Sequence, residues 1–78
     1  MIQKNVERIR KAKGITKTHM AKKLGLTLQG YIYIANGKVR LDVERLNLIS
    51  KILDVEPAIF FNEKLTDSVI KEYEAKIS

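Results

Sequence analysis

The side chains that could support catalysis are few and scattered in this sequence of 78 residues. His19 is the only histidine and cysteine is absent, so one chain cannot assemble a nucleophile–base triad or a site of several His/Cys metal ligands. Neighbouring carboxylates occur as Asp42/Glu44 and Glu72/Glu74, where helix capping and a solvated helix face explain them better than general acid–base chemistry. We therefore expect a protein without enzymatic activity, metal site or cofactor.

A glycine–lysine pair at Gly37-Lys38 is of the kind found in phosphate-binding loops. In such a loop an earlier glycine lies five residues before the second one, and a hydroxyl residue follows the lysine. Here Gly30 lies seven residues before Gly37, and Val39 follows Lys38. The pair therefore does not predict a nucleotide site.

Binding to a polyanion is better supported, because the charges are divided along the chain. Residues 1–40 hold ten Lys and Arg and a single acid, Glu7, for a net charge of +9, whereas residues 41–78 hold five basic and eight acidic residues, for −3. This asymmetry predicts a surface that faces a nucleic acid or an anionic membrane. No apolar run approaches the about 20 residues that span a bilayer, and no secretory signal is visible. The lack of cysteine fits a reducing compartment, so we expect a cytoplasmic protein that is not in a membrane.

Helical periodicity runs through most of the chain. Ile2, Val6 and Ile9 form one apolar stripe, and the apolar residues from Val43 to Leu53 form another helical face. Threonine or aspartate precedes the helical segments as an N-cap, and glycine ends them. Helix starts are predicted at Thr16, Thr27, Asp42 and Thr66. Helix ends are predicted at Gly14, Gly25 and Asn36-Gly37, and a short apolar segment is predicted after Pro57.

Residues 31–34 would favour a β-strand if they stood alone, because they are β-branched and aromatic and because Asn36-Gly37 resembles a hairpin turn. No partner strand follows them. Two short helices joined by about three residues around a glycine describe a helix-turn-helix instead. We therefore predict an all-α fold of five or six short helices.

Several short motifs follow one another without gaps inside this hydrophobic frame. They are Lys13-Gly14-Ile15-Thr16, Met20-Ala21, Leu24-Gly25-Leu26-Thr27, Asn36-Gly37-Lys38 and, after Leu46, Ile49 and Leu53, Asp54-Val55 and Phe60-Phe61. In this order and spacing, residues 2–61 resemble the Cro/C1-type (XRE) helix-turn-helix family of phage repressors and bacterial regulators. The resemblance implies a lambda-repressor-like five-helix DNA-binding domain over residues 1–62, with a C-terminal helical extension over residues 63–78.

The resemblance also implies which residues contact DNA, because in this family the helix that opens after Thr27 enters the major groove. By position, the implied base contacts are Leu28, Gln29 and Tyr33. Gln29 suits bidentate bonding to adenine, and Leu28 can lie against a thymine methyl. The implied phosphate contacts are Lys17, Thr27, Asn36, Lys38 and Arg40.

The segment after Thr27 departs from its relatives by being apolar. Leu28, Ile32 and Tyr33 stand where polar residues are usual, and Tyr31 fills a position that is normally a buried aliphatic one. This leaves Gln29, with help from the tyrosines, to read sequence. It also leaves open that the apolar face binds another protein.

The C-terminal extension carries an apolar stripe on a helix too short to be stable in water alone, so it must pack against something. Two domains that read adjacent turns of DNA must also be held about 34 Å apart. We therefore predict a homodimer contact within residues 58–77, although the extension could instead fold over its own domain. The predicted dimer contacts are Phe60, Phe61, Val69, Ile70, Tyr73 and Ile77.

The function that these features favour is sequence-specific binding of double-stranded DNA by a transcription regulator, a repressor, on a phage or mobile element. Two alternatives remain open. One is an antitoxin with a toxin partner, and the other is a helix-turn-helix module that binds a protein antagonist. Peripheral membrane binding is less favoured, because the basic residues are spread over a globular frame and not along one amphipathic helix.

Overall fold

The computed structural model describes residues 1–77, which form helices joined by short turns. In chain order these are α1 (Ile2–Ala12), α2 (Lys17–Leu24), α3 (Leu28–Ala35), α4 (Val43–Leu53), a short 3-10 helix η1 (Pro57–Phe61) and α5 (Glu63–Ile77). The predicted all-α fold is confirmed, including the helix over the β-branched and aromatic residues of α3.

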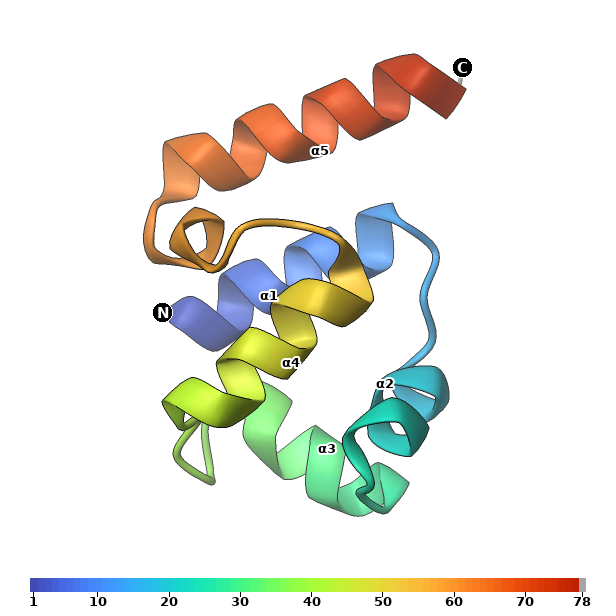
Figure 1. The fold of residues 1–78 in the computed structure, drawn as a ribbon, viewed down its shortest axis with the longest axis vertical. Helices are drawn as coiled ribbons and strands as arrows, with labels where there is room; N and C mark the ends of the chain where they lie inside the picture. Colours follow the sequence, from blue (N-terminus) through green and yellow to red (C-terminus); the bar gives the residue numbers. More distant parts are fainter. Residues whose placement is uncertain (78) are drawn as a thin grey trace.

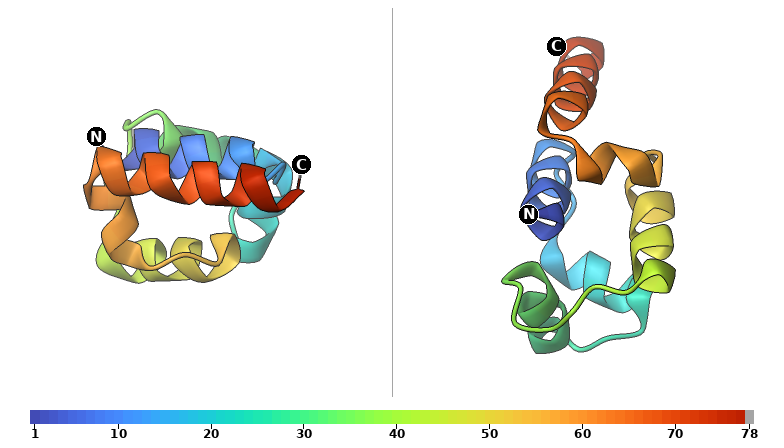
Figure 2. Two further views of the ribbon diagram at one scale, coloured as in Figure 1. Left: turned by 90° about the horizontal axis from the view of Figure 1, so that it is seen from above. Right: turned by 90° about the vertical axis from the view of Figure 1, so that its left-hand side faces the viewer.

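The helices are stacked along the longest axis of the molecule, which measures 32 Å. Helix α5 lies at one end of this axis and α3 at the other, with α1 and α4 between them (Figure 1). Seen from the side, α1 and α3 lie in one layer and α4 in the opposite one (Figure 2). The two ends of the molecule therefore present different elements, α3 with α2 at one and α5 at the other.

Three of the predicted N-caps are confirmed by their hydrogen bonds. The side-chain oxygens of Thr16, Thr27 and Asp42 accept from backbone amides three residues further on, at 3.0, 3.0 and 2.8 Å. Each cap satisfies one of the amides that a helix start leaves without a partner.

The core lies where α1, α2, α3, α4 and η1 converge. Its buried side chains are Val6, Ile9, Met20, Ala21, Tyr31, Leu46, Ile49, Leu53 and Phe60. Val43 was expected on the buried face of its helix but is 74% exposed. It is the first residue of α4, and the side chains that pack this helix against the core begin one turn later, at Leu46.

The prediction that Thr66 caps the last helix is wrong. This helix begins at Glu63, and the cap is Asn62, whose side-chain oxygen accepts from the amide of Leu65 at 3.0 Å. Thr66 is fully buried instead, and its hydroxyl donates to the carbonyl of Ile59 at 2.8 Å. A threonine can satisfy its hydroxyl inside a helix in this way, so its type alone does not mark a helix start.

Helix α5 is anchored on its own domain. Val69 and Ile70 pack against the core, and α5 contacts α1 and η1. The side-chain amide of Asn5 in α1 donates to the carbonyl of Phe60 at 2.9 Å, which fixes η1 to α1. The extension therefore folds over its own domain, which is the alternative that the sequence left open.

Candidate nucleic-acid interface

The turn between α2 and α3 sets the angle between these two helices. Gly25 ends α2 with a φ of +70°, a left-handed conformation that a Cβ disfavours. The amides of Gly25 and Leu26 donate back to Lys22 and Ala21 at 3.2 and 2.8 Å, which closes the end of α2. Thr27 then caps α3 two residues after the glycine. The helix-turn-helix geometry predicted from the sequence is therefore present.

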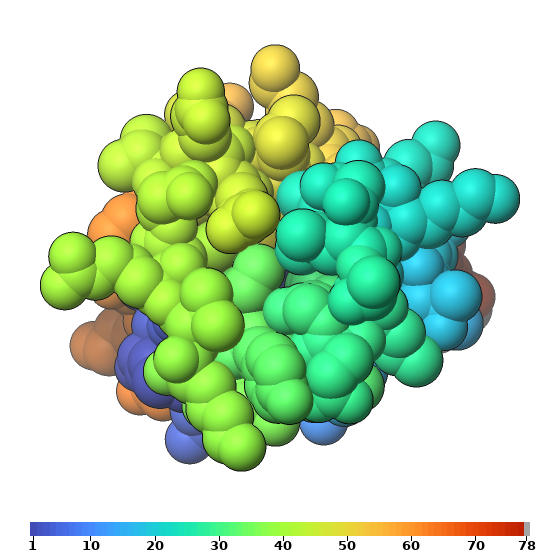
Figure 3. Space-filling view, turned by 90° about the horizontal axis from the view of Figure 1, so that it is seen from below, coloured from blue at the N-terminus to red at the C-terminus, as the bar shows by residue number. Residues whose placement is uncertain are grey.

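Helix α3 is anchored by one side and exposed on the other. Tyr31 and Ile34 are buried, whereas Leu28, Gln29 and Tyr33 are exposed. The structure thus brings the three predicted base contacts together on the outer side of one helix. Figure 3 shows the end of the molecule where α3 lies beside the end of α2 and the segment that leads into α4.

A buried polar network fixes α3 to α1. The hydroxyl of Tyr31 donates to Oε2 of Glu7 at 2.7 Å, and Arg10 donates to both carboxylate oxygens of Glu7, at 2.8 and 3.0 Å. Arg10 also donates to the carbonyl of Ile15 at 2.7 Å. Glu7 and Arg10 together therefore link helix α1 to the middle of α3 and to the loop before α2.

The contacts within this network shift the pKa values of Glu7 and Tyr31. Burial by itself would raise the pKa of Glu7, but the hydrogen bonds from Arg10 and Tyr31 outweigh it, and the pKa lies below its ordinary value. Burial, together with the bond to Glu7, raises the pKa of the Tyr31 hydroxyl. The network is therefore a carboxylate–guanidinium pair with a neutral tyrosine donor at neutral pH.

The turn after α3 is shaped by Tyr33. The backbone carbonyl of Tyr33 accepts from the amides of Lys38 and Val39 at 2.9 and 3.3 Å. The ammonium group of Lys38 lies 5.5 Å from the centre of the Tyr33 ring. Tyr33, which was predicted only as a base contact, thus also positions the lysine that was predicted to contact phosphate.

The predicted phosphate contacts lie around α3 but not all on one side of it. Thr27 is exposed at the start of this helix, and Asn36, Lys38 and Arg40 are exposed in the segment after its end. Lys17 is half-buried at the start of α2 and lines a groove together with Asn36. The structure therefore brings Lys17 and Asn36 together, and it places Lys38 and Arg40 in the turn beyond them.

Sequence reasoning missed two apolar residues at this end of the molecule. Val39, in the turn after α3, is 40% exposed, and Val43 begins α4 beside the same turn. It also missed the network of Glu7, Arg10 and Tyr31. Two features of the sequence could have indicated this network: Glu7 and Arg10 are one helical turn apart, and Tyr31 stands at a position that suits an aliphatic residue.

The predicted dimer contacts are placed very differently from one another. Phe60 is fully buried in its own domain, so it offers no surface to a partner. Val69 and Ile70 are half-buried against the core, and Tyr73 lies half-buried with the ammonium group of Lys13 5.4 Å from its ring centre. Only Phe61 and Ile77, each 64% exposed, are open on the surface of one chain.

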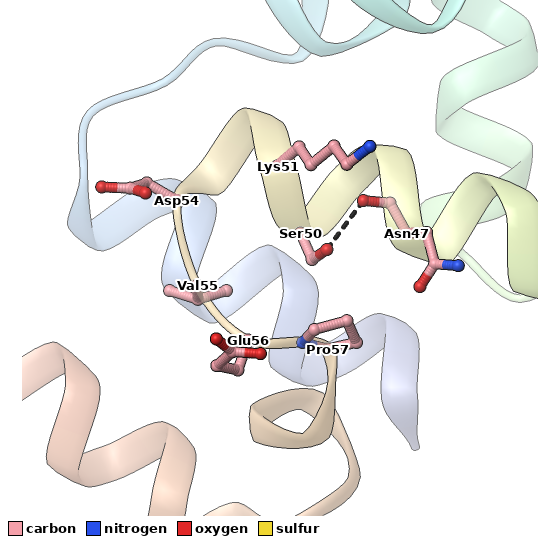
Figure 4. A pocket seen from close by; sticks show the side chains of 7 residues that line it. All are labelled: Asn47, Ser50, Lys51, Asp54, Val55, Glu56 and Pro57. Carbon is pink, nitrogen blue, oxygen red and sulfur yellow. Dashed lines mark hydrogen bonds between the residues drawn. The ribbon is translucent and has the colours of Figure 1, made fainter.

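Another open groove lies between α4 and the segment before η1 (Figure 4). Its lining is mostly polar and includes Lys51 and the carboxylates of Asp54 and Glu56. The Ser50 hydroxyl donates to the carbonyl of Asn47 at 2.7 Å, so no base within the groove activates it. Within residues 1–77 no cluster of His, Cys, Asp and Glu could hold a metal ion, and no helix could cross a membrane.

The fold and the exposed face of α3 define a helix-turn-helix DNA-binding domain. A family model described as helix-turn-helix matches residues 6–60, which is more than half of the chain. The chain therefore belongs to the Cro/C1-type (XRE) helix-turn-helix family, a family of DNA-binding regulators. No curated protein and no solved structure matches it.

Proposed function

We propose that the chain is a cytoplasmic repressor that binds double-stranded DNA in a sequence-specific manner as a homodimer. The observation that carries this proposal is the outer side of α3, where Leu28, Gln29 and Tyr33 are exposed between the Thr27 cap and a basic turn. A helix of this kind fits the major groove, and its side chains can reach base edges. Repression needs no further surface, because a protein on an operator excludes others from the same DNA.

Selection of bound duplexes from a random pool tests this proposal. We expect an enriched site made of two related half-sites whose centres are about one helical turn apart, with adenine at one position of each half-site for Gln29. Recovery of duplexes without a shared sequence would contradict sequence-specific reading. The promoter that contains the enriched site would then be compared with and without the protein, and repression predicts lower transcription with it.

The placement of α5 limits how two copies can associate on DNA. Because α5 and α3 lie at opposite ends of the 32 Å axis, a dimer formed through the outer side of α5 would point its two α3 helices away from each other. Such a dimer cannot place both helices in successive major grooves on one face of the duplex. A side-to-side dimer can, and Phe61 supports it. This exposed phenylalanine is the last residue of η1, and the chain passes from η1 into α5 at one side of the stack (Figure 1).

Sedimentation of two matched variants tests the dimer. Phe61→Glu and Ile77→Glu each place one charge at a side chain of equal exposure. We expect Phe61→Glu to be a folded monomer and Ile77→Glu to remain a dimer. A dimer that survives Phe61→Glu, or that Ile77→Glu abolishes, would contradict the side-to-side arrangement. These variants are better suited than removal of α5, because Thr66 in that helix is part of the buried interior.

A second candidate function, binding of a protein such as a toxin or an antagonist, is favoured by one observation. Four exposed side chains are largely apolar and lie on α3, in the segment that follows it or at the start of α4: Leu28, Tyr33, Val39 and Val43. Apolar contact with a protein depends little on salt, whereas contact with phosphates weakens steeply with it. Co-expression with the product of the adjacent gene, followed by purification at high salt, would detect such a complex. Leu28→Asp should abolish this complex if the apolar face is the contact.

A further inference from the structure

A second basic surface lies on the α1 side of the molecule, outside the outer face of α3. An open groove of about 460 Å³ lies there, between α1, the start of α2 and the end of α3. Its cationic lining comes from Lys4, Arg8 and Lys11 of α1 and from Lys17 of α2. The one acid in its wall, Glu7, is already bonded to Arg10 and Tyr31. The groove is therefore strongly positive.

The three basic residues of α1 form one row. Positions 4, 8 and 11 are spaced by four and three residues, so their side chains lie on the same side of the helix. Arg8 is paired with Asp67 of α5, whereas the ammonium groups of Lys4 and Lys11 form no ion pair within residues 1–77. Two unpaired cations thus face solvent beside a third that α5 holds in place.

This row begins next to the turn that follows α3. The Met1 sulfur would lie 3.4 Å from a Cβ at Gly37, so the start of α1 touches that turn. Asn36, which precedes Gly37, lines the same groove as Lys4 and Lys17. A strand of DNA that passes the turn after α3 therefore has the α1 row directly beside it. Seven residues of helix rise about 10 Å, which is close to the axial rise of three nucleotides.

We propose that this groove binds backbone phosphates of the DNA that α3 reads, and that Lys4 and Lys11 are the cations that contact them. The inference rests on the proposed DNA-binding function. It adds to the base-reading helix a second strip of backbone contacts that carries no sequence information. The groove is open and not enclosed, which suits a continuous backbone better than a small molecule.

The test compares two double variants that lose the same charge from different places. Lys4→Ala/Lys11→Ala removes the two groove lysines, and Lys51→Ala/Lys76→Ala removes two exposed lysines, one of α4 and one of α5, that do not line the groove. The affinity of each full-length variant for a random-sequence duplex is measured as a function of salt. Each phosphate contact contributes about 0.9 to the slope of log K against log salt.

We expect the groove variant to lower the magnitude of that slope by about 1.8 for each bound protomer, and the Lys51→Ala/Lys76→Ala variant to lower it by less than half as much. Equal slopes for the two variants, both folded by circular dichroism, would overturn the groove proposal and leave DNA binding intact. Failure of the unmodified protein to bind any duplex would instead refute the DNA-binding function itself. Competition by free inorganic phosphate at constant ionic strength, if it required Lys4 and Lys11, would assign the groove to a free anion and overturn the proposal.

Discussion

The bond between Tyr31 and Glu7 offers a sensitive test of how α3 is held in place. Tyr31→Phe removes only the hydroxyl, which donates to the carboxylate at 2.7 Å, and leaves the buried ring in the core. A hydrogen bond to a charged group contributes about 1.5–3 kcal/mol, and we expect the free energy of unfolding to fall by this amount. For a domain of this size that corresponds to a melting temperature lower by about 6–24 °C.

Thermal and urea unfolding followed by circular dichroism measure this change, with Tyr33→Phe as the control. Tyr33 is on the same helix but exposed, and its hydroxyl has no protein partner within residues 1–77, so its loss should cost less than about 0.5 kcal/mol. In a Glu7→Gln background, where the acceptor is neutral, the cost of Tyr31→Phe should fall to about 0.5–1.5 kcal/mol. Equal costs for Tyr31→Phe and Tyr33→Phe would refute the idea that this bond anchors α3.

Further predictions concern pH, DNA reading and the attachment of α5. The folded-state pKa of Glu7 lies below its ordinary value of 4.5, so the contribution of Glu7 to stability is complete above pH 4.5 and is lost as the pH falls through the folded-state pKa. Acid unfolding of Glu7→Gln should therefore depend less steeply on pH below 4.5 than acid unfolding of the unmodified protein. Gln29→Ala should reduce the free energy of binding to the selected site by about 1–3 kcal/mol and relax the preference at one base pair of each half-site. Lys38→Ala should instead weaken binding to all duplexes alike. Gel-shift titrations on matched and mutated sites measure both effects. Thr66→Val removes the hydroxyl that donates to the carbonyl of Ile59 and leaves that carbonyl with only the amide of Asn62, at 3.3 Å. Unfolding in urea should therefore show a loss of about 0.5–1.5 kcal/mol, and no loss would mean that the bond from Asn62 is sufficient.

Much of this fold was predictable because its helix ends are set by local chemistry. Thr16, Thr27 and Asp42 accept hydrogen bonds from amides only three residues away, so residue type and position are enough to identify them. Thr66 misled for the opposite reason, since its partner Ile59 belongs to η1 and the bond depends on how η1 and α5 meet. The sequence shows that residue 66 is a threonine but not which residue accepts the hydrogen bond from its hydroxyl.

The candidate interface was predictable to a similar extent. The resemblance to the family grouped Leu28, Gln29 and Tyr33 in advance, and in the structure all three are exposed on α3. The contact between Tyr33 and Lys38, and the groove between α1 and α3, depend on packing between separate segments. For the same reason the sequence could not place the predicted dimer residues, since whether Phe60 or Phe61 faces outward depends on the turn that η1 makes.

Helix α3 divides its residues between two tasks. Tyr31 and Ile34 face inward and hold the helix, whereas Leu28, Gln29 and Tyr33 face outward and have no part in the core. Exchange of outward side chains on such a helix usually changes stability by less than about 0.5 kcal/mol. Binding preference can therefore diverge under selection while the scaffold is preserved, with the reservation that Tyr33 also supports the turn that carries Lys38. With the base contacts proposed above, positions 28 and 29 are the ones at which this protein could acquire a new target site in a single step.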